Sequence, residues 1–582
     1  MLFKYFRKID YAIIAAIIVL IYIQVYLELE IPGYMAAITT IMTTGGTGQD
    51  VLDQGVWMIA CAFGSLLLYV VMGALAAYFG TSLGKTLRER QFDQVKRFSS
   101  EELGRFSINT LITRSTNDVT QAQMVATIGT IVVIRAPIMA IQAIMKISTK
   151  NMDWTLTTVV AIIALIVSIL VILLYVHPRF KRIQWLNDDV NRITREGISG
   201  IRVVHAYNAE DYQEGKFFKA NKTLTDTHLD VTRALAFLMP TITLIMNLLT
   251  MGIYFIGAVI ISEAMGPEKF VLFSDMIVFS SYALQVIAAF LILMVVLMIL
   301  PRALVAYRRI DAVVETKPSI QDGDVDEPPE GREGEISFKD VSFRYPGASQ
   351  DTLSDISFDI GKGETVALIG STGSGKSTLV KLILRFYDVT SGQVLVDGVD
   401  VRDYRVSSLN DKLGYVPQKA MLFNASIASN VNYGSTEGQR TEDDMRKAVA
   451  IAQGTEFVER IDGQYQSVVS EGATNLSGGQ KQRLSIARAV CKRPEIYIFD
   501  DSFSALDYKT DKRLRSELRK ETSGATTIIV AQRIGTIMDA DKIIVLDEGR
   551  VVGLGRHKDL LRDCEVYYQI ASSQLSEEEL MS

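Results

Sequence analysis

Gly370-Ser-Thr-Gly-Ser-Gly-Lys-Ser-Thr378 is the stretch of this 582-residue sequence that decides the fold. It follows the strand-like run Thr365–Ile369 and precedes the helical run Leu379–Leu384. A strand, a glycine turn and a helix N-terminus in this order are what a phosphate-binding loop requires, because the free N–H groups of the helix attract anions. The sequence therefore predicts a nucleotide-binding α/β domain around this loop.

The residue types inside the loop indicate which nucleotide is bound. Gly373 and Gly375 leave backbone N–H groups free to close around phosphate, and Lys376 places a positive charge at the β- and γ-phosphates. The hydroxyl of Ser377 suits Mg²⁺. We therefore expect ATP and Mg²⁺ as cofactors. The predicted nucleotide-binding residues of the loop are Gly370, Ser371, Thr372, Gly373, Ser374, Gly375, Lys376, Ser377 and Thr378.

Two stretches further along the chain add to this site. Ile496-Tyr-Ile-Phe-Asp500 is a strand that ends in a carboxylate, which can hold Mg²⁺ through water beside the phosphate loop. Leu476-Ser-Gly-Gly-Gln480 precedes the helical run Lys481–Ala489 and forms a second helix N-terminus suited to an anion. One chain cannot easily bring both glycine loops to one phosphate. A second copy of the domain is therefore implied.

The surrounding sequence sets the limits of this domain. Short β-type runs alternate with helical runs over residues 335–573, as in an α/β domain. An acidic linker that contains Pro328 and Pro329 precedes it at 317–334, and an acidic tail follows it at 574–582.

Residues 1–316 have a different character. They contain six apolar stretches, each close to the roughly 20 residues that a helix needs to cross a ~30 Å hydrocarbon core. The expected spans are 11–29, 55–78, 125–147, 156–176, 234–261 and 276–300. The sequence thus predicts an all-α, six-helix transmembrane domain followed by an α/β P-loop ATPase domain.

The basic residues predict the orientation in the membrane. Seven Lys and Arg residues lie between the second and third spans and ten between the fourth and fifth, whereas the loops on the other side hold only Lys150 and Lys269. Because Lys and Arg concentrate on the cytoplasmic side, both termini and the ATPase domain are expected in the cytoplasm, with the spans in the cell membrane.

Composition excludes several other classes of protein. The net charge of −6 argues against a nucleic-acid partner, because such proteins usually carry a basic surplus. Only three cysteines occur, far apart at positions 61, 491 and 564, which excludes a disulfide scaffold and a cysteine-based zinc cluster.

The six spans and these motifs together resemble a half-transporter of the bacterial ABC exporters, and the resemblance covers nearly the whole chain. It implies that Tyr345, in Phe343-Arg-Tyr-Pro346, stacks on adenine, and that Gln418, in Tyr415-Val-Pro-Gln418, reaches Mg²⁺ and the attacking water. It also implies that Glu471 senses the membrane domain. The resemblance assigns Leu476, Ser477, Gly478, Gly479 and Gln480 to the partner's ATP site, and Ser504, Ala505, Leu506 and Asp507 to a loop between the two ATP sites.

Two positions depart from the pattern of this family. Where the family usually has a Glu general base after Asp500, this chain has Asp501, and where the family has a switch His, it has Gln532. A shorter carboxylate and an amide are poor replacements, and loss of general-base help commonly costs ~10²–10⁴ in rate. This chain's own site is therefore expected to bind ATP but to cleave it slowly.

The intact signature beside these substitutions resembles one half of the heterodimeric multidrug exporters. It implies a partner half-transporter that carries the Glu and the His. A homodimer that tolerates both substitutions is the alternative.

The two cytoplasmic connections are long and helix-like in composition. Ile112–Asp118 and His205–Glu210 resemble the coupling helices of the family, which dock on ATP-binding domains.

The cargo is predicted only by class. Frequent Phe, Tyr and Met residues in the spans suit bulky apolar molecules, although they also suit any helical core. We expect ATP-driven export of amphipathic small molecules or drugs. A lipid or peptide exporter, an importer of the same fold and a non-transporting, ATP-gated regulator remain alternatives. Arg135 and Lys146 lie within the third span, where an ionisable residue is a functional hypothesis by default.

Overall fold

The computed structural model describes residues 2–148, 152–266, 268–434 and 440–575. Its Cα positions divide into two compact units. The first comprises Met1–Gln94 and Asn109–Glu315, and the second comprises Val95–Ile108 and Thr316–Ser582. Most of the acidic tail expected at 574–582 lies outside the described residues.

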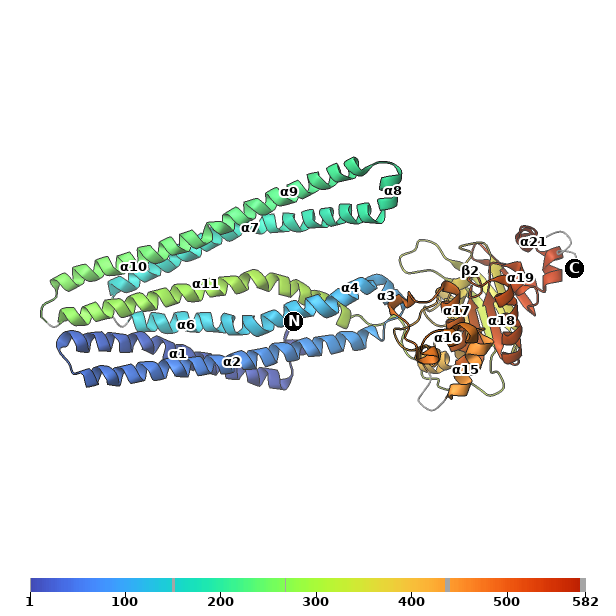
Figure 1. The fold of residues 1–582 in the computed structure, drawn as a ribbon, viewed down its shortest axis with the longest axis horizontal. Helices are drawn as coiled ribbons and strands as arrows, with labels where there is room; N and C mark the ends of the chain where they lie inside the picture. The colour runs from blue at the N-terminus through green and yellow to red at the C-terminus, as the bar shows by residue number, and fades with distance from the viewer. Residues whose placement is uncertain (1, 149–151, 267, 435–439, 576–582) are drawn as a thin grey trace. The chain divides into compact units, whose positions relative to one another are not determined.

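The first unit is helical (Figure 1). Four of its long helices are unbroken, one run contains two π-helical turns, and one run is divided at Phe237. Their bounds are α1 Lys8–Thr44, α2 Gly48–Val95, α4 Ile108–Thr113, α5 Val119–Met124, α6 Thr130–Ser148, α7 Met152–Ser199, α8 Ile201–Ala206, α9 Glu210–Ala236, α10 Leu238–Glu263 and α11 Glu268–Val314, with the π turns at Arg114–Asp118 and Val125–Gly129.

Within the described residues, six helical runs are long and apolar enough to cross a membrane. The first five expected spans lie inside these runs, and the sixth, 276–300, begins in the run Glu268–Ile292 and lies within α11, so the prediction of six candidate spans is confirmed. The runs are longer than the spans: α2 and α7 have 48 residues each. At 1.5 Å per residue such a helix is about 70 Å long, more than twice a ~30 Å hydrocarbon core. The helices therefore continue beyond the membrane.

The spans expose apolar side chains as a lipid-facing surface does. Phe63 and Leu174 are both 68% exposed, and Trp57 is 61% exposed. The packed core lies between the helices, where Ile21 and Phe279 have no exposed area. In water such a surface would aggregate, whereas hydrocarbon solvates it.

The second unit contains two sheets. The four-stranded sheet has the order β2-β1-β4-β5, and the six-stranded sheet has the order β10-β9-β3-β8-β7-β6. In the larger sheet β9, β3, β8, β7 and β6 pair in parallel and β10 is antiparallel to β9. The strands are β1 Ile336–Phe343, β2 Leu353–Ile360, β3 Thr365–Gly370, β4 Ser391–Val396, β5 Val399–Asp400, β6 Leu413–Val416, β7 Ile496–Asp500, β8 Thr526–Val530, β9 Lys542–Asp547 and β10 Arg550–Gly555.

Helices join these strands, as the βα alternation predicts. Strands β3 and β7 are central and buried, with patterns of continuous apolar residues typical of parallel strands. The helices are α12 Lys376–Ile383, α13 Val406–Lys412, α14 Ile427–Val431, α15 Glu442–Ile451, α16 Thr455–Arg460, α17 Gly478–Lys492, α18 Tyr508–Glu521, α19 Ile534–Ile537, α20 His557–Asp563 and α21 Glu565–Ser572.

One short helix of the first cytoplasmic connection belongs to the second unit. This helix is α3, Ser100–Phe106. Glu102 accepts hydrogen bonds from the backbone N–H of Ser319 at 2.9 Å and from that of Ser99 at 2.8 Å. Ile112–Asp118, which resemble a coupling helix of the family, continue the helical run 108–148 of the first unit, and their docking on an ATP-binding domain stays a prediction.

Candidate active site

The phosphate loop joins β3 to α12 and adopts a backbone that favours glycine. Gly373 and Gly375 have φ angles of +87° and +101°. A Cβ atom on Gly375 would lie 2.5 Å from the side chain of Leu353, so a larger residue would also meet steric overlap there. These glycines leave the N-terminus of α12 uncapped by any side chain. The free N–H groups at that end suit a phosphate group.

Lys376, the first residue of α12, lies across the loop. Its Nζ donates hydrogen bonds to the carbonyl oxygens of Gly370 at 2.8 Å and Ser371 at 2.7 Å. Burial lowers the pKa of Lys376, and the nearby carboxylates of Asp500 and Asp501 oppose that shift. A buried ammonium held only by neutral oxygens gains a strong partner when an anion enters the loop.

Ser377 and Asp500 meet at the end of β7. The Ser377 hydroxyl donates to Oδ1 of Asp500 at 2.9 Å, and Asp500 as a whole is only 5% exposed. Burial raises the pKa of Asp500, the Ser377 hydrogen bond lowers it, and the adjacent Asp501 raises it further. A hydroxyl and a carboxylate side by side, beside a phosphate loop, are the oxygen ligands that Mg²⁺ prefers. These two residues, with Gln418 nearby, fit that ion.

The two positions that depart from the family pattern, Asp501 and Gln532, are hydrogen-bonded to each other. Asp501 accepts hydrogen bonds at Oδ2 from Gln532 Nε2 at 2.9 Å and from Gln418 Nε2 at 3.2 Å. Its φ angle of +48° lies in the left-handed region, which is uncommon for a non-glycine residue. The structure thus brings Asp501, Gln418 and Gln532 into one cluster, in which both amides donate to the same carboxylate oxygen of Asp501.

Tyr345 lies in a small aromatic group on the same unit. Its ring makes edge-to-face contacts with Phe343 and Tyr387, at centroid distances of 4.9 and 5.2 Å. Its hydroxyl lies 3.1 Å from Thr378 Oγ1, at the loop. A cavity of about 410 Å³ opens beside it, lined by Ser100, Glu101, Gly104, Arg105, Tyr345, Pro346 and Tyr387.

Helix α3 is therefore a neighbour of the nucleotide site that the sequence analysis missed. A signal for it exists, because Ser99 and Glu102 form a capping box at the start of α3.

The signature residues form the other helix N-terminus of this unit. Ser477 caps α17: its Oγ accepts from the Gln480 N–H at 3.3 Å, while Gln480 Oε1 accepts from the Ser477 N–H at 2.8 Å. Ser477 and Gly478 are exposed, and a Cβ atom on Gly478 would meet nothing within 4 Å. Leu476 is buried beneath them.

The expected inter-site loop packs beside this signature. A Cβ on Gly479 would lie 3.2 Å from the carbonyl oxygen of Ala505. At the two ends of the loop, Ser504 Oγ donates to the Asp501 carbonyl at 2.9 Å, and Asp507 caps α18 by accepting from the Thr510 N–H at 3.0 Å. Glu471 lies before the signature in a short 3₁₀ turn and is exposed.

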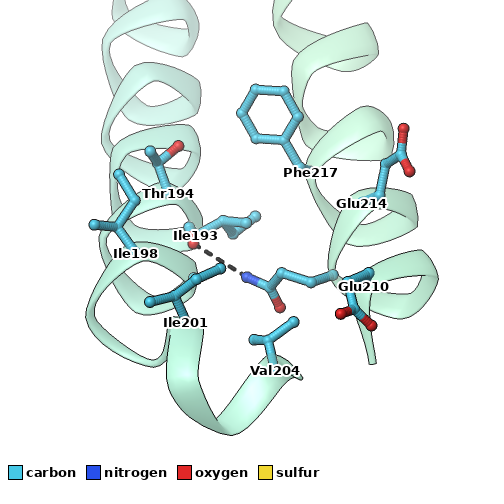
Figure 2. A pocket seen from close by; sticks show the side chains of 10 residues that line it. Ile193, Thr194, Ile198, Ile201, Val204, Glu210, Glu214 and Phe217 are labelled. Carbon is cyan, nitrogen blue, oxygen red and sulfur yellow. Dashed lines mark hydrogen bonds between the residues drawn. The ribbon is translucent and has the colours of Figure 1, made fainter. Parts of the chain in front are cut away.

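In the second long connection, the short helix α8 joins α7 to α9, and an apolar groove lies beside it (Figure 2). The groove has a volume of about 440 Å³, and Gln213, one of its lining residues, donates from Nε2 to the Ile193 carbonyl at 3.3 Å. Figure 2 shows Ile201 and Val204 on α8 facing Phe217 on α9. The groove belongs to the first unit, and α8 itself has no buried residue.

Known proteins share both units. Residues 353–504 match the ABC transporter family, and residues 14–290 match the ABC transporter transmembrane region. An uncharacterized ABC transporter ATP-binding protein of Mycobacterium tuberculosis is 38% identical over 564 residues, 97% of this chain and 96% of the relative. The chain belongs to the ABC transporter family.

Two other comparisons describe the kind of ABC transporter. An ATP-dependent lipid A-core flippase of Aromatoleum aromaticum is 32% identical over 514 residues, 87% of this chain and 83% of the flippase. The structure of a bacterial Atm1-family ABC exporter with ATP bound matches with a TM-score of 0.79, over 98% of this chain and all of that one. At 24% identity that likeness concerns the fold. This ABC transporter thus has an exporter-type architecture of six spans followed by an ATPase domain.

Proposed function

We propose that this ABC transporter exports amphipathic small molecules across the cytoplasmic membrane, as one half of a heterodimer whose own ATP site is catalytically weak. The observation that carries the proposal is the cluster at Asp501. Its Oδ2 accepts two amide hydrogen bonds, from Gln418 and Gln532. An amide next to a general base donates to it and competes with the water that the base must polarise.

The binding half of the site is complete. Lys376 and the free N–H groups of α12 attract phosphate, and Ser377 with Asp500 would hold Mg²⁺, which supplies charge neutralisation between the phosphates. The expected consequence is an ATP site that stays occupied and turns over slowly.

The exposed signature supplies the second half of the argument. Ser477 and Gly478 lie at the N-terminus of α17, open to another molecule. In the proposed heterodimer they complete the partner's site, where helix N–H groups stabilise charge that spreads over the transferred phosphoryl group. ATP-driven closure of the two ATPase domains then opens the cavity outward, and hydrolysis at the partner's site resets it.

The positions of α8 and the basic residues support the remaining parts of the proposal. The exposed Ile201–Ala206 helix is a candidate docking element for an ATPase domain. The Lys and Arg surplus in the two long connections supports a cytoplasmic location for those connections, both termini and the ATPase domain.

Lipid export is the second candidate. Relatives named lipid A-core flippase are 31–32% identical to this chain over more than 500 residues. Lipids are themselves amphipathic. Export of lipids and export of amphipathic small molecules therefore both require a cavity that accepts an apolar body with a polar head.

The test compares the chain alone with the chain co-expressed with a partner half-transporter that carries the Glu and the His. We expect the purified chain alone to show little ATPase activity and the pair to hydrolyse ATP and to drive saturable uptake of a fluorescent amphipathic dye into inverted vesicles. In the pair, ATP rather than ADP should occupy the Lys376 site in the steady state. Rapid ATP turnover by a verified homodimer would exclude the asymmetric proposal, and turnover without uptake of dye or lipid would favour the ATP-gated regulator.

A further inference from the structure

Two ion pairs join α1 to α6, one within the expected spans and the other at Glu30, directly after the first span. Arg135 Nη2 lies 2.7 Å from Glu28 Oε2, and Lys146 Nζ lies 2.7 Å from Glu30 Oε1. Arg135 and Lys146 lie within the apolar run of the third span, and Glu28 lies within that of the first. Ionisable side chains in such runs are costly, and they face protein or a water-filled cavity rather than lipid.

The side chains of both ion pairs are partly exposed. The side chain of Glu28 is 28% exposed, that of Arg135 is 19% exposed, and those of Glu30 and Lys146 are 24% and 34% exposed. A charge whose open side faces lipid is unfavourable, so the open side must face water in the transport cavity or the other half of the transporter.

A polar network extends the first pair to a third helix. Gln24, which is 2% exposed, donates from Nε2 to Glu28 Oε2 at 2.8 Å and to Ser65 Oγ of α2 at 2.9 Å. The exposed ring of Tyr69 lies 5.7 Å from the Arg135 guanidinium carbon, and that of Tyr26 lies 5.6 Å from Lys146 Nζ. The pairs thus lie beside aromatic faces that suit an apolar or cationic group.

Within the described residues, one donor and one acceptor of this network are unsatisfied. Among the described residues, Arg135 Nε and Gln24 Oε1 are buried and have no hydrogen-bond partner. Buried polar atoms normally have partners, and leaving one unsatisfied is unfavourable. A group that accepts a hydrogen bond at Arg135 and a group that donates one at Gln24 would satisfy both.

Charge balance gives the class of ligand. Each ion pair is neutral, and in a site of low dielectric constant a ligand that displaces one partner leaves the other charge uncompensated. An anion alone would strand Glu28, and a cation alone would strand Arg135. A ligand that carries both charges satisfies both.

We propose that Glu28, Arg135 and Gln24 form a cargo site for zwitterionic amphiphiles, with the anionic group at Arg135, the ammonium at Glu28 and Gln24, and the apolar body against Tyr69. The inference rests on the proposed export function and narrows its cargo. A zwitterionic lipid headgroup and a free amino-acid zwitterion share this chemistry.

The experiment measures binding without ATP, so that it is independent of transport. The assembled transporter is placed in nanodiscs, and equilibrium dialysis compares probes that share a twelve-carbon tail: dodecyl phosphoethanolamine, dodecyl methyl phosphate and dodecylamine. We expect the wild-type protein to bind the zwitterion at least about tenfold more tightly than either singly charged probe, a difference of about 1.4 kcal/mol. Naphthylalanine tests the amino-acid source: its binding favours that source, and its failure to bind favours a lipid headgroup.

Single substitutions should invert the preference in opposite directions. Arg135→Gln leaves Glu28 without a partner, so dodecylamine should become the tightest-binding probe. Glu28→Gln leaves Arg135, so dodecyl methyl phosphate should become the tightest. The double variant Glu28→Gln with Arg135→Gln leaves no stranded charge, which favours folding, and should bind the three probes equally. Arg192→Gln, which removes the exposed pair with Glu196 on α7 outside the expected spans, is the matched control and should behave as wild type.

The possible outcomes distinguish a cargo site from an ion pair that only joins helices. They also distinguish failure of the cargo-site proposal from failure of the export proposal. If the double variant loses thermal stability but keeps the zwitterion preference, the pair only joins helices and the proposal is overturned. The proposal is likewise overturned if wild-type protein binds the three probes equally while dye uptake proceeds, an outcome that leaves the export function standing. Zwitterion binding without any ATP-driven uptake would support the site and count against the export function.

Discussion

Two glycine-rich helix N-termini lie in the same ATPase domain, and their surroundings differ. The N-terminus of α12 has no side-chain cap, and Lys376, Ser377 and Asp500 of its own chain surround it. The N-terminus of α17 is capped by Ser477 and exposed. The first is equipped to hold a nucleotide with the residues of this chain, whereas the second has an anion-binding end and exposes it to another molecule. In the proposed heterodimer, the first N-terminus would bind this chain's own ATP and the second would complete the partner's site.

The largest effect should come from removing the charge at α12. Lys376→Ala takes away the ammonium that now contacts only carbonyl and hydroxyl oxygens and that is positioned for phosphate. We expect ATP affinity at this chain's own site to fall by about 10²-fold, as loss of charge-assisted hydrogen bonds predicts. Photolabelling of each half with an azido-ATP analogue measures it. Equal labelling of the variant and the wild type would show that this lysine is not needed for binding.

The next comparison places one substitution at each N-terminus within the purified heterodimer. Ser477→Arg fills the open end of α17 and should reduce the ATPase rate of the pair by about 10²-fold or more, the typical loss when a transition-state donor is removed. Asp501→Ala should reduce the ATPase rate by less than about fivefold, because Asp501 is proposed not to act as the general base. Removal of a working general base would instead cost ~10²–10⁴ in rate. Both variants are checked for assembly. Equal damage from the two would show that Asp501 is a working base and that the two sites are not asymmetric.

The third change tests whether the weak site can be repaired. Asp501→Glu combined with Gln532→His restores the longer carboxylate and the imidazole, and removes one of the two amide donors at Asp501 Oδ2. We expect this chain's own site to gain about 10²-fold in hydrolysis. The readout is the ADP content of its site during turnover, with Gln532→Asn as a control that keeps the amide. Unchanged ATP occupancy would mean that something other than these two residues limits the site.

The sequence predicted those parts of the structure in which local pattern and chemistry coincide. The phosphate loop between β3 and α12, the carboxylate at the end of β7 and the six spans each have a local signature of spacing or apolar length. The structure also brings together Asp501, Gln418 and Gln532, which the family pattern implied belong to one site.

The features that the sequence analysis missed depend on partners far apart in the chain. Arg135 and Glu28 pair although they are 107 positions apart in the sequence. The residues around either one do not identify the other as its partner. Helix α3 was also missed, although the capping box at Ser99 marks its start. That box was available in the sequence; what it did not show is that Glu102 would accept from the backbone of Ser319, 217 positions away.

The smallest effect should separate capping from anion binding at α17. Gln480 Oε1 accepts from the Ser477 N–H and so stabilises the helix end. Gln480→Ala removes that acceptor and should lower the free energy of unfolding of the ATPase domain by about 1 kcal/mol or less, as other caps do. Gln480→Glu keeps the acceptor and adds a negative charge at a helix N-terminus, which should raise the free energy of unfolding by a few tenths to about 1 kcal/mol. The same charge would repel the partner's phosphate.

The Glu variant should therefore be the more stable of the two and the less active, with an ATPase rate in the heterodimer several-fold below that of Gln480→Ala. Thermal unfolding of the two purified heterodimers and their ATPase rates at saturating ATP provide the two measurements. If stability and activity rank the variants in the same order, Gln480 acts only as a cap and the N-terminus of α17 does not face a phosphate. If they rank them in opposite orders, α17 carries both roles at once: its cap serves this chain, and its remaining free N–H groups serve the partner.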